Sequence, residues 1–422
     1  MSDDPQPPNP FPGGFDLSQL FSMLGHKGPV NWDVARQIAM VVARADADAD
    51  GEFGAALSTP PPPEPPIDPR TVDDIGALVR AALPRVVDLT GQTDAFALPV
   101  RVIGRTEWVT DHLEALRPVL EAFATALEEA TADDTTPDVV GADTDPFGGL
   151  MSVIAPVLLG VQAGSMVGQL ARRALGRYDL PLPTGDAPSI VVTVTNVDDF
   201  EAAWSLDRED VRFAVVIHEV VHAAIRSIDW VRELLVQLAV QYVSAYRVDP
   251  AAIEAAFGEL DPTDPASLAG LQADPGALLG AISSPEQRIV GERLQLVMSV
   301  LEGYADAVIA QVAEPLIPSY PQIREAAKRH RLDRGEAGAL IESLLGIELD
   351  RDHYEQGEAF CHGVVERAGL DGLNRLLIDE TFLPTPNELA APGLWLARID
   401  LPNDVELPDD FEVPDDLGEL DG

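Results

Sequence analysis

The sequence predicts a mainly α-helical protein with a small β element. Apolar residues recur at helical spacing in eight stretches, and one further stretch has the β-branched composition of a strand. Because 46% of the 422 residues are hydrophobic, the chain can bury a sizeable core. The predicted helices cover residues 31–44, 71–83, 106–130, 151–176, 208–247, 285–313, 322–345 and 354–368.

Residues 28–402 are predicted to form the folded domain, with a Pro-rich linker inside it at 59–69. Residues 1–27 are rich in proline and glycine, so we expect a flexible tail there. This tail lacks the basic start and apolar run of a signal peptide. Residues 403–422 hold nine acidic residues and no basic one, which predicts an acidic disordered tail.

The helix predicted at 151–176 belongs to an uncharged run, residues 146–171, that is long enough to span a membrane. It is less apolar than typical spans, since it contains Pro156 and two glutamines. Gly160, Gly164 and Gly168 recur every four residues, a pattern that permits close helix contact in membranes and in soluble cores. We favour a buried core helix and expect no membrane span.

The predicted strand covers residues 189–195, which read Ser-Ile-Val-Val-Thr-Val-Thr between Pro188 and Asn196. An open strand edge can pair with an extended peptide. Pairing of the 189–195 strand with a peptide is a hypothesis.

Two histidines, His218 and His222, lie four residues apart with Glu219 between them. On a helix this H-E-x-x-H pattern places both imidazoles on one face, where they can bind one zinc ion (Zn2+), and Glu219 can act on a water molecule. The flanking residues are almost all apolar, which predicts a buried helix. Burying these polar groups without partners costs several kcal/mol, roughly. The alternative is a pair of core histidines hydrogen-bonded to backbone.

A catalytic zinc site needs a third protein ligand and an open fourth position. A histidine six residues after the second is excluded, because that position is Ile228. Glu302 is the candidate, on a helix whose start is marked by Ser284, Pro285 and Gln287. Asp306, four residues later on the same face, could accept the N–H of a zinc-bound imidazole. A solvated acidic pair is the alternative for Glu302 and Asp306.

With these motifs the chain resembles a family, the zincin-like hydrolases described as zinc-dependent metallopeptidases of actinobacteria. The resemblance implies a zincin-like core with the H-E-x-x-H helix buried, His218, His222 and Glu302 as zinc ligands, and Glu219 as catalytic base. It implies no particular substrate. The matching segments are Gly28-Pro-Val-Asn-Trp32, the run from Leu175 to Pro183, Val211 to His222, Ser299 to Gly303, Tyr354 to Gly357 and Leu383 to Leu389.

The function these features predict is a zinc-dependent peptidase with Glu219 as general base and a peptide or protein as substrate. Tyr304 and Tyr354 are possible donors to the oxyanion of the transition state, although each is also an ordinary packing tyrosine. The alternative is a non-catalytic zinc-binding or interaction protein. A fourth ligand such as His353 or His362 would close the site and favour that alternative.

Charge and cysteine content exclude some classes of partner. The net charge of −43 would repel a phosphate backbone, so we expect no nucleic-acid binding. Cys361 is the single cysteine, so no intrachain disulfide can form, and a cytoplasmic location is expected.

Overall fold

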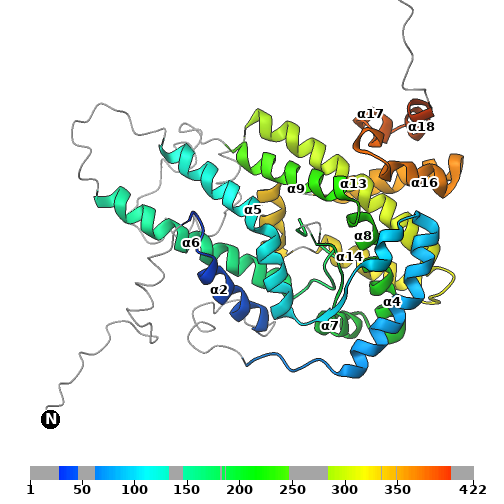
Figure 1. Cartoon of the computed structure of the whole chain (residues 1–422), viewed down its shortest axis with the longest axis horizontal. Helices are drawn as coiled ribbons and strands as arrows, with labels where there is room; N and C mark the ends of the chain where they lie inside the picture. Colours follow the sequence, from blue (N-terminus) through cyan, green and yellow to red (C-terminus); the bar gives the residue numbers. More distant parts are fainter. Residues whose placement is uncertain are drawn as a thin grey trace, which may run out of the picture.

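The computed structural model has the predicted fold class, mainly α-helical with a two-stranded sheet (Figure 1). The predicted tails, residues 1–27 and 403–422, lie outside the described residues, as does the start of the predicted linker. The structure describes residues 28–45, 62–132, 146–180, 183–185, 187–246, 284–333, 335–347 and 349–400.

Each predicted helical stretch overlaps a described helix, although several bounds differ and the helices at 194–204, 386–389 and 392–400 were not predicted. Helix α13 has the predicted bounds and begins with the predicted capping box, in which Ser284 accepts from the backbone N–H of Gln287. The helices are α2 (Trp32–Arg44), α4 (Pro69–Thr90), α5 (Arg105–Ala132), α6 (Pro146–Ala171), α7 (Val194–Trp204), α8 (Arg208–Arg226), α9 (Asp229–Ser244), α13 (Pro285–Ala313), α14 (Tyr320–Leu332), α15 (Gly335–Leu345), α16 (Arg351–Asn374), α17 (Pro386–Leu389) and α18 (Pro392–Asp400).

Two predicted long helices are each two helices. The stretch 208–247 breaks between α8 and α9, where Ile228 adopts an extended conformation and caps α9. The stretch 322–345 breaks between α14 and α15, where Gly335 has a φ of 62°, in the left-handed region. Both breaks are short, so the apolar periodicity continues across them and hides them in the sequence.

The sheet consists of β1 (Val100–Ile103) and β2 (Ile190–Thr193), paired in parallel with Val100 opposite Ile190. Strand β2 is shorter than predicted because α7 begins at Val194, and β1 was not predicted. On the other side of β2, Val192 forms a bridge with Gly176, and the N–H of Thr193 donates to Leu175. The edge hypothesised to pair with a peptide is therefore already occupied at these residues.

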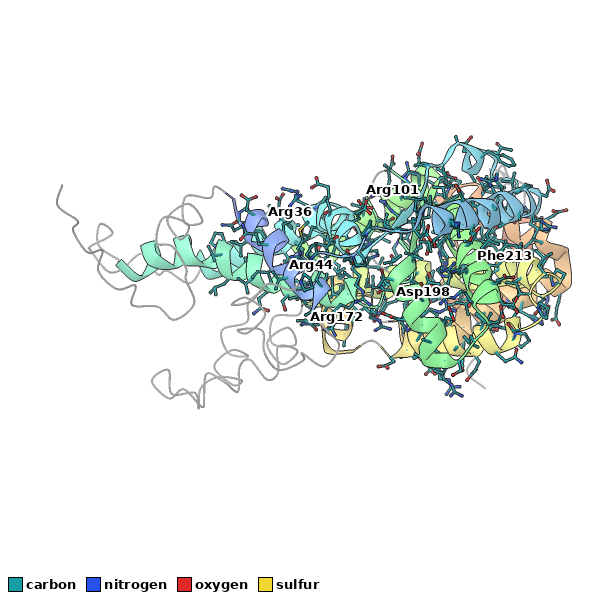
Figure 2. The ribbon with its side chains drawn as sticks, turned by 90° about the horizontal axis from the view of Figure 1, so that it is seen from below. Arg36, Arg44, Arg101, Arg172, Asp198 and Phe213 are labelled. Carbon is teal, nitrogen blue, oxygen red and sulfur yellow. The ribbon has the colours of Figure 1, made fainter. Side chains whose placement is uncertain are left out.

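Helix α8 lies in the middle of the molecule, in contact with α4, α7, α9, α13, α14 and β2. In Figure 1, α2, α5 and α6 lie on one side of it, and α4, α16, α17 and α18 lie toward the other. Figure 2 shows α6 extending along the molecule beneath α2, on which Arg36 and Arg44 are labelled. The buried apolar residues of both sides belong largely to one continuous cluster.

The glycine pattern of α6 serves close contact with α2. A Cβ on Gly160 would lie 2.5 Å from the carbonyl oxygen of Asn31, and one on Gly168 would lie 2.7 Å from Cβ of Val42. A Cβ on Gly164 would meet the carbonyl oxygen of Ala35. Within the described part of the chain, α13 is the helix long and apolar enough to cross a membrane, and 72% of its apolar window is buried inside the protein.

Replacing Gly164 by alanine is expected to lower the free energy of unfolding by about 1–3 kcal/mol, because α2 and α6 must separate to admit the methyl group. Thermal unfolding of the full chain measures the loss. Gly76→Ala is the matched control, since the nearest atom there is the flexible end of Arg80 and alanine favours a helix. Equal melting temperatures for the two variants would contradict the close-contact role of Gly164.

Candidate functional site

Helix α8 carries the H-E-x-x-H residues at its middle. Its start is fixed by Asp207, whose side chain accepts from the N–H groups of Glu209 and Asp210. Both acids also suit the positive end of the helix dipole. Farther along the helix, Glu219 is fully buried and His222 is 2% exposed, whereas 19% of the His218 side-chain surface is exposed.

The two imidazoles lie side by side, with ring centroids 4.4 Å apart. Burial lowers the pKa of His222 well below its usual value, so the ring is neutral and keeps a lone pair for a ligand. Among the described residues, the buried Nε2 of His222 has no hydrogen-bond partner. The ring of Tyr178 is stacked near His222 at 6.2 Å between centroids. His222 is therefore held in place with one nitrogen unsatisfied, which native cores rarely allow without a function.

The carboxylate of Glu219 is held by the backbone that precedes β2. Its Oε2 accepts from the N–H of Arg177 at 2.8 Å, and its Oε1 accepts from the N–H of Tyr178 at 3.2 Å. The Nδ1 of His218 lies 3.3 Å from Oε1. Burial raises the pKa of Glu219, and these donors and His218 oppose the rise. A carboxylate fixed in this way can accept a proton at a defined position.

Because Gly176 has no side chain, the carboxyl group of Glu219 can occupy the space beside it. A Cβ there would collide with the Glu219 carboxyl group and lie 2.6 Å from the carbonyl oxygen of Val191. We expect Gly176→Ala to displace Glu219 and to cost about 1–3 kcal/mol of stability. The check is to measure hydrolytic activity and thermal unfolding beside Gly76→Ala. A fully active and stable Gly176→Ala protein would show that this contact is not needed.

The third predicted ligand, Glu302, lies on α13 and is 5% exposed. Arg331 of α14 reaches this helix and forms two ion pairs, at 3.4 Å to Glu302 and 3.3 Å to Asp306. Burial raises the pKa of Glu302, while the charge of Arg331 opposes the rise. Asp306 was predicted to accept the N–H of a zinc-bound imidazole. Among the described residues, its carboxylate forms an ion pair with Arg331.

The donor types fit a zinc ion, although their present arrangement does not form a metal cage. Among the described residues, no group of three or more His, Cys, Asp or Glu side chains is placed to hold a metal ion. The unsatisfied Nε2 of His222 fits a ligand role, and the carboxyl of Glu302 is close enough to His218 for their charges to interact. Glu302 would have to share its carboxylate between a metal ion and Arg331.

Sequence reasoning missed two arginines of the site. Arg226 is 4% exposed, and its Nε and Nη1 have no hydrogen-bond partner among the described residues. It follows His222 by four residues, so the helical spacing could have indicated it. Its charge interacts with Glu302. Arg331 comes from a different helix, and no spacing in the sequence connects it to Glu302.

The other residues predicted near the site have different partners. The hydroxyl of Tyr304 is buried and donates to Oδ1 of Asn374, which makes it a packing tyrosine. Tyr354 lies beside Arg331, with the guanidinium 5.7 Å from the ring centroid. Of the possible fourth ligands, His353 pairs with Asp350 at 2.7 Å, and His362 lies 3.7 Å from Glu366 on an exposed part of α16.

Comparison with known proteins identifies the family of the chain. The family model of the zincin-like metallopeptidases matches residues 30–396. A crystal structure from Chloroflexus aurantiacus, of a protein proposed to be a hydrolase with a novel fold, is 25% identical in sequence with a TM-score of 0.58. The alignment covers 88% of this chain and 99% of that chain. No curated protein matches the sequence. Because the family model covers most of the chain, the protein belongs to the zincin-like metallopeptidase family.

Proposed function

We propose that the protein is a zinc-dependent peptidase in which Glu219 is the general base. The observation that carries the proposal is the unsatisfied Nε2 of His222, buried beside His218 on one face of α8. Family membership supports hydrolysis as the reaction. His218, His222 and Glu302 would hold the zinc ion, which when bound supplies a Lewis acid that polarises a carbonyl group and acidifies water.

The residues of the chain carry the proton transfers. Glu219 is fixed by the N–H groups of Arg177 and Tyr178, so its carboxylate is oriented before substrate binds. It takes a proton from the attacking water and delivers it to the leaving amine. Because His222 is neutral, one of its ring nitrogens has a lone pair available for a metal ion. Because Glu219 and Glu302 are buried, their electrostatic interactions are stronger than they would be in bulk water.

The proposal is tested by digesting a peptide library with the full chain and identifying the products by mass spectrometry. We expect cleavage that EDTA abolishes and added zinc restores. The zinc content of the protein is measured in parallel. Stoichiometric zinc without cleavage of any peptide would leave the non-catalytic zinc-binding alternative, and cleavage that survives complete metal removal would exclude the zinc mechanism.

A further inference from the structure

A pocket beside the candidate site collects positive charge on a strongly acidic protein. Its floor and walls come from α13, α14 and α16, and its lining includes Asp306, Arg324, Lys328, Arg331, Arg351 and Glu358. The space is about 430 Å³, including the part open to solvent. Four of these residues are cationic, whereas the whole chain has a net charge of −43. The excess of cations over acids in this lining favours an anionic ligand.

The spacing of the cations shows why they meet there. Arg324, Lys328 and Arg331 stand at positions i, i+4 and i+7 of α14, so they share one face of that helix. Arg351 and Glu358 stand seven residues apart on α16 and line the same pocket. The pocket therefore lies between two helix faces.

Most of the charges in the pocket are already paired. Arg331 pairs with Asp306 at 3.3 Å, and Arg324 pairs with Glu358 at 2.5 Å. Arg351 pairs at 2.8 Å with Glu355, which lies outside the lining. Lys328 is different, because no ion pair or hydrogen bond involves its ammonium group among the described residues. It is one of only two lysines in the chain. The pocket thus has an unmatched positive charge at Lys328.

Arg331 connects this pocket to the candidate site. It lines the pocket and also pairs with Glu302, at 3.4 Å. Its charge acts on His218 and His222 as well. An anion bound in this pocket would therefore lie beside Arg331, whose guanidinium also contacts the proposed ligand Glu302.

We propose that this pocket binds a carboxylate of the peptide substrate, with Lys328 as the main contact. The inference rests on the proposed peptidase function for the identity of the ligand, since every unmodified peptide ends in a carboxylate. An acidic side chain would offer the same group.

The test measures binding to the full chain by isothermal titration calorimetry, with three probes. They are N-acetyl tetra-alanine with a free C-terminus, the same peptide as C-terminal amide, and an amide in which one alanine is replaced by glutamate. We expect the free acid to bind about tenfold more tightly than the tetra-alanine amide, as a charge-assisted contact predicts. The preference should weaken as salt is raised. The glutamate peptide distinguishes a terminal carboxylate from a side-chain carboxylate as the group that is bound.

Lys328→Gln should remove most of the preference for the free acid, and Lys328→Arg should keep it. Arg293→Gln is the matched control, because Arg293 is exposed, does not line the pocket and pairs with Glu380. The proposal would be overturned if neither the free acid nor the glutamate peptide bound more tightly than the tetra-alanine amide, or if the preference for a carboxylate were unaffected by Lys328→Gln. Failure of hydrolysis alone would not, because binding is measured independently of cleavage, so the two proposals can fail separately.

Discussion

Replacing Glu219 by glutamine is expected to lower peptide hydrolysis by about 10²–10⁴-fold, the usual contribution of a positioned general base. Glutamine has nearly the same shape but cannot take a proton from water. The nitrogen ligands His218 and His222 are unchanged, so the zinc content should stay the same. The measurement is the rate of cleavage of a peptide identified from the library digest, together with metal analysis of the same sample.

The same substitution also has a structural effect that must be separated from chemistry. Both oxygens of Glu219 accept backbone N–H groups, from Arg177 and Tyr178. Glutamine can accept only one of them, and its amide nitrogen would face the other donor. This mismatch costs about 1–3 kcal/mol. Thermal unfolding will show whether the variant is folded at the assay temperature. Glu209→Gln, an exposed change on the same helix, is the matched control and should retain activity. A folded Glu219→Gln protein with full activity would exclude Glu219 as the base.

Replacing Glu302 by glutamine is expected to weaken zinc binding by at least about 100-fold, because effects of about 10–100-fold are already seen for partners that only orient ligands. The variant loses the anionic ligand, and the positive charges of Arg226 and Arg331 remain beside the site. These cations would repel Zn2+ once Glu302 no longer neutralises them. Zinc retained after dialysis against a competing chelator measures the effect.

The control for Glu302→Gln is Glu292→Gln, an exposed change of the same kind on α13. It should leave the zinc content unchanged. Melting temperatures of both variants are needed, because removing one partner of a buried ion pair can cost about 3–5 kcal/mol. If folded Glu302→Gln protein held zinc as tightly as the control, Glu302 would be removed from the set of ligands.

We propose that Asp306 supports the site through Arg331. It was predicted to orient an imidazole, and its described ion pair is with Arg331, which also pairs with Glu302. Asp306 therefore shares the charge of Arg331 with the proposed ligand. By neutralising part of the charge of Arg331, Asp306 would leave the carboxylate of Glu302 more available to a metal ion.

The sequence by itself determined the features that depend on neighbouring residues. The four-residue spacing of His218 and His222 places them on one helix face wherever that helix packs, and their rings do lie 4.4 Å apart. The start of α13 follows from Ser284, Pro285 and Gln287, which satisfy the N-terminal backbone groups locally. The β-branched composition of β2 likewise marked it as a strand.

Only the tertiary structure decided the surroundings of these residues. The backbone that holds Glu219 lies about forty positions before it, and Arg331 reaches Glu302 from another helix. The short breaks beside Ile228 and Gly335 turn single predicted helices into pairs, and the second break lets α14 and α15 take separate positions. Such contacts depend on how helices pack across the core, and no local periodicity records that packing. The sequence therefore determined the candidate residues on α8 and α13, and the packing of α8 against α13 and α14 decided which charges surround them.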